Sequence, residues 1–249
     1  MADAGKMMWA VFFAVAVFVS RADGTYGHVT VEKYPDADAV LVDSLEESRY
    51  NPDGTYVSED SNTIKILTEK GRREEGVISL SYNARYGVSK IVEVKVTSAD
   101  GTVRDVDFAK TTKEATDNSS VSANIYDPMD RKIVCTIPGL KIGDVVHYRT
   151  RKEVKMSRVK NHYANIFVFE WTCPILRQTV RIIAPKDRPL KRMAVRNPLG
   201  NVKYSSKTLA DGGVEHVWVA LNSPQAFAEP DTPPLYKRSF SYYKRMEGF

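Results

Sequence analysis

Cys173, His216 and Asp231 are the residue types of a cysteine-dependent hydrolase or transglutaminase, in which a thiolate attacks a carbonyl carbon. Such a nucleophile needs a lowered pKa, which a helix N-terminus and a nearby histidine usually provide. Cys173 instead lies between Trp171 and Pro174, between two strand-like segments, and no helical periodicity follows it. The sequence therefore does not favour catalysis by this triad.

The histidines are too scattered to predict a metal site. They are His28, His147, His162 and His216, and the chain has no His-x-x-x-His or Cys-x-x-Cys pair. Structural and catalytic zinc sites need closely spaced ligands. We therefore expect neither a metal nor another cofactor.

Basic residues alternate with apolar ones over residues 137–155, whose sequence is IPGLKIGDVVHYRTRKEVK. After turns at Pro138-Gly139 and Gly143-Asp144, a strand would place one set of side chains on each face. The apolar face has Val146, Tyr148, Val154 and Met156, and the polar face has His147, Arg149, Arg151, Glu153 and Lys155. Arg149, Arg151 and Lys155 are candidates to bind a glycan or a peptide, because arginines bind carboxylates and the 13 tyrosines and 3 tryptophans can stack on sugar rings. The alternative is a solvated strand face that binds no ligand.

The composition is that of a globular protein. The chain has 249 residues, of which 43% are hydrophobic and 27% charged, enough for one large or two small β domains. Its formal net charge of +5 comes from 36 basic and 31 acidic residues spread along the sequence. A dispersed excess of this size does not predict nucleic-acid binding.

The first 22 residues resemble a secretory signal peptide. Lys6 precedes an apolar run over residues 7–19, and Ser20-Arg21-Ala22 has small residues at the two positions that signal peptidase reads. The run is shorter than the roughly 20 residues of a membrane-spanning helix, although an uncleaved anchor is the alternative. We expect an exported protein of the periplasm, the cell envelope or the extracellular space.

Cys135 and Cys173 are the two cysteines, and each lies among apolar residues. One interpretation is a pair of buried thiols. Because export exposes cysteines to an oxidising compartment, a disulfide between neighbouring strands is the other.

Short alternating segments separated by turn signals follow the signal segment. We predict a first strand over residues 28–34 and a hairpin of residues 39–50 and 55–68 around Asn51-Pro52-Asp53-Gly54, with a turn at residues 69–71. Further strands are predicted over residues 77–82, 88–98, 102–108, 132–137, 146–155, 163–171, 176–184, 201–205 and 214–221, and an exposed loop over residues 111–124.

This pattern predicts an all-β fold, an antiparallel β-sandwich over residues 28–222. The strands are many for one seven-stranded sandwich, so an elongated pair of packed sheets and two β lobes divided near residues 111–124 both fit. Residues 223–249 form a proline-rich linker and a basic-aromatic tail, which we expect to be a short helix or irregular.

The segment Ile-Pro-Gly-Leu-Lys-Ile-Gly-Asp-Val-Val-His-Tyr at residues 137–148 resembles a strand–turn–strand block of a known bacterial family. This family is the β-rich domain of unknown function that precedes a transglutaminase-like core in exported proteins. Residues 37–41, 63–71, 95–103, and 217–218 with 228–230 and 233–234 are similar to its other blocks, in the same order. The resemblance covers residues 34–234.

The resemblance implies a β-sandwich module placed before a transglutaminase-like or peptidase-like catalytic domain, in the same chain or as a partner. In the family, the catalytic residues belong to the core after the proline-rich exit, and the residues after Pro234 are too few to contain it. No catalytic residue is therefore carried over, and the module either belongs to a truncated or split gene product or acts alone. We expect a non-catalytic module for substrate presentation or scaffolding; the alternative is a stand-alone envelope protein that binds a glycan or a peptide.

Overall fold

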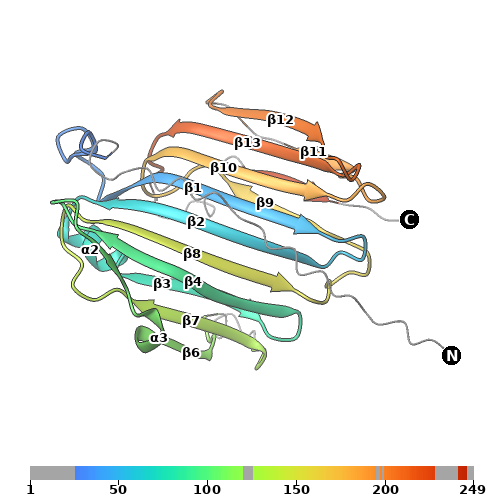
Figure 1. Cartoon of the computed structure of the whole chain (residues 1–249), viewed down its shortest axis with the longest axis horizontal. Coiled ribbons are helices and arrows are strands. Elements are labelled where there is room, and N and C mark those ends of the chain that lie inside the picture. Colours follow the sequence, from blue (N-terminus) through green and yellow to red (C-terminus); the bar gives the residue numbers. More distant parts are fainter. Residues whose placement is uncertain (1–25, 120–125, 195–196, 198, 228–240, 246–249) are drawn as a thin grey trace.

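The computed structural model describes residues 26–119, 126–194, 197, 199–227 and 241–245, the last five as backbone. The described chain is mostly β-strand, and most of its strand pairs are antiparallel. Its sheets lie in two layers (Figure 1). The predicted all-β, sandwich-like fold is confirmed.

One eight-stranded sheet runs the length of the molecule (Figure 1). Its order is β12-β13-β10-β1-β2-β8-β4-β5. The strands are β1 (Ala39–Tyr50), β2 (Tyr56–Ile66), β4 (Gly87–Thr97), β5 (Val103–Asp105), β8 (Val145–Val154), β10 (Ile175–Ala184), β12 (Val202–Thr208) and β13 (Val214–Ser223). The predicted hairpin is β1 and β2, which pair from Tyr50–Tyr56 to Ala39–Ile66.

Two three-stranded sheets form the other layer. One has the order β3-β7-β6 and lies beside β4 and β8 in Figure 1; the other has the order β11-β14-β9 and lies toward β10 and β13. Their strands are β3 (Val77–Asn83), β6 (Thr112–Thr116), β7 (Asp130–Thr136), β9 (Ala164–Val168), β11 (Arg192–Ala194) and β14 (Ser241–Arg245). One long sheet backed by two small ones fits the elongated pair of packed layers. The chain does not divide into two lobes near residues 111–124, because β4 and β8, which lie before and after that segment, pair in the long sheet.

The core follows this division. The first cluster packs β1, β2, β4 and β8 against β3 and β7, with Ile66, Val96 and Cys135 fully buried. The second packs β10 and β13 against β9, with Trp218 and Val180 at its centre. In β1, Ala39 and Leu41 belong to the first cluster, whereas their neighbours Val40 and Val42 pack on the opposite face of the sheet. The face of the long sheet that carries the first two clusters is called the inner face below.

The strand predicted over residues 28–34 is wrong. These residues form turns, in which the backbone N–H groups of Lys33 and Tyr34 both donate to the carbonyl of Thr30. Val29 packs with Val40, Val42 and Leu67 on the outer face of the sheet, and Tyr34 packs against the same cluster. The apparent alternation therefore reflects side chains that turns, rather than a strand, bring to the sheet.

Three further predictions are corrected. Residues 69–71 begin a short helix, α2 (Glu69–Glu74), because the Thr68 hydroxyl accepts a hydrogen bond from Gly71 N at 3.1 Å and caps it. The polar segment 111–124 contains the last residue of α3 (Phe108–Thr111) and the edge strand β6, whose hydrogen-bond partner is β7. Residues 241–245 of the predicted helical or irregular tail form β14, which pairs with both β9 and β11.

One strand pair departs from the predicted antiparallel pattern. β1 and β10 are parallel, with Leu41 opposite Ile175 and Arg49 opposite Ile183. The chain leaves the long sheet after β8, passes through β9 in the other layer, and returns beside β1 as β10. A parallel pair needs such a crossover, which local turn signals do not reveal.

Trp218→Ala tests whether the second cluster stabilises the whole sheet. Trp218 is 1% exposed, so truncation leaves a cavity and should lower the free energy of unfolding by about 3–5 kcal/mol in urea denaturation. Leu221→Ala, on the same strand but 43% exposed, is the matched control and should cost less than about 1 kcal/mol. Equal losses in the two variants would contradict the assignment of this core.

Candidate functional site

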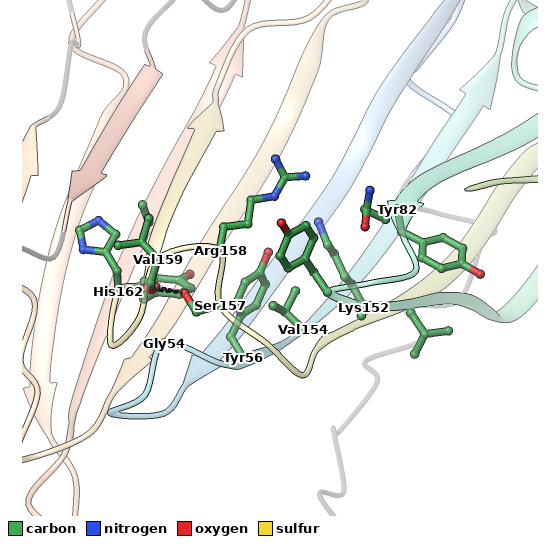
Figure 2. Close-up of a pocket in the computed structure, with 15 residues that line it drawn as sticks. Gly54, Tyr56, Tyr82, Lys152, Val154, Ser157, Arg158, Val159 and His162 are labelled. Atoms are coloured by element: carbon green, nitrogen blue, oxygen red, sulfur yellow. Dashed lines mark hydrogen bonds between the residues drawn. The ribbon is translucent and has the colours of Figure 1, made fainter. Parts of the chain in front are cut away.

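A pocket of about 380 Å³ lies where three chain segments meet at one end of the long sheet (Figure 2). The turn between β1 and β2, the turn between β3 and β4, and the loop after β8 supply its walls. The lining residues are Gly54, Tyr56, Tyr82, Asn83, Tyr86, Gly87, Val88, Lys152, Val154, Ser157, Arg158, Val159, His162, Tyr163 and Ala164. A volume of this size is at the lower end of the range for small-molecule sites.

Hydrogen bonds hold the loop after β8 in place. Lys155 N and Met156 N both donate to the carbonyl of Tyr86, at 2.8 and 3.1 Å. Ser157 Oγ lies 2.6 Å from the carbonyl oxygens of both Val159 and His162, so its proton can serve either. These contacts tie the loop to the β3–β4 turn and to itself, which preforms one wall of the pocket.

The turn between β1 and β2 packs against the same loop without space between them. Asn161 N donates to the carbonyl of Asp53 at 3.1 Å. Gly54 has φ +87°, and a Cβ atom there would lie 2.4 Å from the carbonyl oxygen of His162. Glycine is therefore required at residue 54 both by backbone conformation and by contact.

Aromatic rings form much of the pocket's surface. Tyr163 stacks on Tyr50 with ring centroids 4.4 Å apart and meets Tyr56 edge to face at 5.2 Å. Across the pocket, the guanidinium of Arg158 lies over the ring of Tyr86, 4.9 Å from its centroid. These contacts fix the positions of the rings before any ligand arrives.

The ionisable basic residues that line the pocket are Lys152, Arg158 and His162, and the lining contains no Asp or Glu. Figure 2 shows Tyr56, Lys152 and Arg158 extending from separate elements toward the same region. Among the residues that the structure describes, Arg158 and His162 form no ion pair. The arrangement can attract and hold an anionic group next to aromatic faces.

Behind Lys152, polar side chains cross the inner face of the long sheet and separate the first two core clusters. They are Ser44, Glu46 and Ser48 of β1, Ser58, Asp60 and Asn62 of β2, Thr150 and Lys152 of β8, Ser89 of β4 and Gln178 of β10. We call this set the polar seam. In β1 it lies between Leu41 of the first cluster and Tyr50 of the second.

Two carboxyl groups face each other in the polar seam, because Glu46 of β1 pairs with Asp60 of β2. Asp60 accepts hydrogen bonds from Ser58 Oγ at 3.2 Å and Thr150 Oγ1 at 3.3 Å, yet burial raises its pKa. Burial, and then the charge of Asp60, raise the pKa of Glu46 to about 8, although Lys152 opposes the shift. Glu46 therefore keeps its proton at neutral pH, where two neighbouring buried carboxylates would repel each other.

Arg149 and Arg151, which the sequence suggested for binding, lie on the outer face, opposite the pocket. Both form ion pairs with Glu59 of β2, and Arg149 also approaches Glu93 of β4 at 3.5 Å. Lys155 follows β8, with an exposed side chain. The ion pairs fit the alternative of a polar sheet face, and a binding role for Arg149, Arg151 and Lys155 stays a prediction.

The structure separates Cys173 from His216. Cys173 packs against the first core cluster two residues before β10 begins, whereas His216 of β13 pairs with Ile182 far along β10. A strand rises about 3.3 Å per residue, so the length of β10 from Ile175 to Ile182 places Cys173 and His216 roughly 20 Å apart. Burial raises the pKa of the Cys173 thiol to about 11, which disfavours the thiolate, and Asp231 lies outside the described residues.

Both cysteines are free thiols, so the structure does not contain the disulfide that the sequence left open. Cys135 is buried in β7, with Thr111 Oγ1 3.5 Å from its sulfur, and Cys173 contacts the same cluster from the other layer. In the described part of the chain, no three His, Cys, Asp or Glu residues gather as metal ligands. No helix there is long and apolar enough to span a bilayer.

Sequence reasoning missed this pocket, although a signal for it exists. Residues 157–163, with the sequence SRVKNHY, follow a strand with a cluster of basic and aromatic residues and no apolar alternation, as binding loops often do. Nothing in the sequence indicated that Tyr86 would lie under Arg158. That contact depends on the pairing of β4 with β8, which no local pattern specifies.

Glu46→Gln should stabilise the protein in a pH-dependent way. The folded state raises the pKa of Glu46 from the ordinary value of 4.5 to about 8. The resulting loss in free energy of unfolding is absent below pH 4.5, grows between pH 4.5 and about 8, and stays constant above that pH. A glutamine is neutral throughout. We expect the melting temperature of Glu46→Gln to be close to that of wild type near pH 4. Near pH 9 its melting temperature should be higher, and its free energy of unfolding should exceed that of wild type by an amount on the order of 2–4 kcal/mol.

The control for that measurement is Glu74→Gln, a carboxylate in α2 whose side chain is 59% exposed. It should shift the melting temperature by little at either pH. An effect of Glu46→Gln that is the same at both pH values would show that the Glu46 carboxyl is not held protonated by the fold.

The thiols should react slowly in the native protein. Because Cys135 is buried and burial raises the pKa of Cys173 to about 11, a disulfide-exchange reagent at pH 8 should modify neither within minutes. In denaturant without reductant, both should titrate. Recovery of no free thiol in denaturant would show that the purified protein carries the disulfide.

The sequence model of a family described as "Domain of Unknown Function with solved-structure structure (DUF3857)" matches residues 52–226. A solved structure titled a putative protease, from Parabacteroides distasonis ATCC 8503, aligns with a TM-score of 0.73 and 19% identity. The alignment covers 84% of this chain and 40% of that one, so the present chain spans well under half of that protein.

A second structure, a CBM3a-L domain with flanking linkers from a Clostridium thermocellum cellulosome scaffoldin, has a TM-score of 0.28 and 12% identity, over 48% of this chain and 69% of its own. Overlap that low supports no argument about fold or function. No curated protein matches the chain. Since the family match spans most of the sequence, from the β1–β2 turn to the end of the last long strand, the protein belongs to the DUF3857 family, a β-rich domain of unknown function.

Proposed function

We propose that the chain is a non-catalytic β-sandwich module that presents substrate to, or acts as a scaffold for, a transglutaminase-like or peptidase-like catalytic domain. The observation that carries the proposal is the structural likeness to 40% of a longer protein titled a putative protease. A fold that occupies part of such a chain is suited to serve beside a second domain. The second domain acts either in the same chain or as a separate partner.

The chemistry of the described residues supports a non-catalytic role. Cys173 has neither a helix N-terminus nor a nearby histidine to lower its pKa, and burial raises that pKa instead. Glu46 and Asp60 lie on the inner face of the long sheet, where the positive charge of Lys152 acts to lower the pKa of Glu46. Neither group is arranged as a nucleophile with its base.

A second candidate function is that of an envelope protein that binds a glycan or a peptide. The observation that favours it is the preformed pocket between the β3–β4 turn and the loop after β8, with its tyrosines and basic groups. The two proposals are compatible, because a module that presents substrate needs a place to hold it. We propose an exported location for both, on the basis of the signal-like first 22 residues.

The non-catalytic proposal predicts that the purified chain neither hydrolyses peptides nor crosslinks amines to glutamine-containing peptides. Wild type and Cys173→Ala should both give the rate of buffer alone, with an authentic transglutaminase as the positive control. Turnover by the wild type that Cys173→Ala abolishes would overturn the proposal.

The genomic neighbourhood separates the two candidates. A reading frame for a transglutaminase-like core next to this one, whose product co-purifies with the chain, is expected for the accessory module. A neighbourhood of polysaccharide genes without such a core would favour the stand-alone binding protein.

A further inference from the structure

We propose that the pocket is a binding site for an acidic glycan, with a sugar carboxylate held by Arg158 and a sugar ring against the tyrosines. This inference rests on the glycan-binding function proposed above and names both its site and its ligand class. The site differs from the one that the sequence suggested, since Arg149 and Arg151 lie on the other face of the sheet. Four observations carry it.

The first is the sign of the charge. Lys152, Arg158 and His162 line the pocket, and its lining contains no Asp or Glu. Three acidic residues lie behind this lining: Glu114 accepts a hydrogen bond from Tyr82 at 2.7 Å, and Asp127 and Asp130 accept from Asn83 at 2.9 and 2.7 Å. The positive charge of Arg158 helps to lower the pKa of Asp127, so that carboxylate offsets part of the charge of Arg158. An anion that enters the pocket therefore meets basic groups in the lining itself, with the carboxylates behind them.

The second is the state of the arginine. The guanidinium of Arg158 lies over the ring of Tyr86, 4.9 Å from its centroid, and among the described residues it forms no ion pair. By contrast, Arg149 and Arg151 are already paired with Glu59. A carboxylate can form two parallel hydrogen bonds with an arginine fork of this kind.

The third is the aromatic surface. Tyr56, Tyr82 and Tyr86 line the pocket with half-buried rings, which combine an apolar face with a hydroxyl at the edge, whereas Tyr163 is 1% exposed and supports the wall from behind. The C–H faces of a pyranose ring pack on such rings while its hydroxyl groups bond to tyrosine and lysine. A volume of about 380 Å³ fits one or two sugar rings better than a folded protein segment.

The fourth distinguishes a glycan from a peptide. An extended peptide is usually bound through backbone N–H and C=O groups. In the pocket wall, Lys155 N and Met156 N already donate to Tyr86, Asn161 N donates to Asp53, and His162 N donates to Val159. Recognition there depends on side-chain rings and charges, which suits a sugar acid.

The test is isothermal titration calorimetry of the whole chain with three probes. They are a hyaluronan oligosaccharide, which alternates glucuronate with N-acetylglucosamine, a neutral chitin oligosaccharide of the same length, and an oligoglutamate peptide of the same charge. We expect the acidic oligosaccharide to bind at least about 10-fold more tightly than either of the others, because only it combines a carboxylate for Arg158 with a sugar ring for the tyrosines.

Two pocket variants and one control assign that binding to the site. Arg158→Gln and Tyr86→Leu should each weaken binding of the acidic oligosaccharide by about 10-fold or more. Arg177→Gln removes the same charge from β10, where the side chain is 59% exposed and outside the pocket's lining, and it should leave binding unchanged. Unaltered circular dichroism and melting temperature show that each variant remains folded.

The proposal is overturned if none of the three probes binds, if the neutral oligosaccharide binds as well as the acidic one, or if the peptide binds better. Equal effects of Arg158→Gln and Arg177→Gln would also overturn it, because they would indicate attraction by net charge alone. A failure here leaves the accessory role intact, since that role depends on the turnover and co-purification measurements. A chain that binds the probe yet also has Cys173-dependent turnover would overturn the accessory role alone.

Discussion

The burial of strand β1 on both of its faces is the constraint on which the rest of the structure depends. Ala39 and Leu41 pack into the first core cluster, Val40 and Val42 pack under the N-terminal turns, and Tyr50 reaches the second cluster. A single strand thus joins all three apolar clusters, and its two neighbours, β2 and β10, extend the sheet in opposite directions. A strand with both faces covered has a fixed register, because a slip of one residue would exchange the two sets of side chains.

The polar seam explains why the molecule has two back sheets. An apolar stripe across the whole inner face would favour one continuous covering layer, but the sequence places Glu46, Asp60 and Lys152 in its middle. Burying ionised groups there is unfavourable. The raised pKa of Glu46 means that this carboxyl stays protonated at neutral pH, which avoids burying one of the charges. The pocket opens at the end of the same sheet and includes Lys152, so the electrostatics of the seam and of the pocket are coupled through that lysine.

The two faces of the long sheet use their basic residues differently. On the outer face, Arg149, Arg151 and Arg181 alternate with Glu59, Glu93, Glu47 and Glu215, so cross-strand ion pairs neutralise the surface. At the pocket, Arg158 and His162 project from a loop that supplies no acidic partner. On strands, the register places each basic side chain opposite an acidic one on the neighbouring strand. Residues of a loop have no such cross-strand partner, so the positive charges of the loop after β8 remain where a ligand can reach them.

The sequence by itself determined most of the strands. The Asn51-Pro52-Asp53-Gly54 turn specified the first hairpin, and alternation in β8 correctly separated Val146 and Tyr148 from Arg149 and Arg151, because both signals depend on neighbours in the chain. Only the tertiary structure decided the partners. The parallel β1–β10 pair, the pairing of strand β6 with β7 and the contact of Arg158 with Tyr86 all join separate segments of the chain. Their hydrogen bonds, charges and burial come from the partner strand, so no local pattern could reveal them.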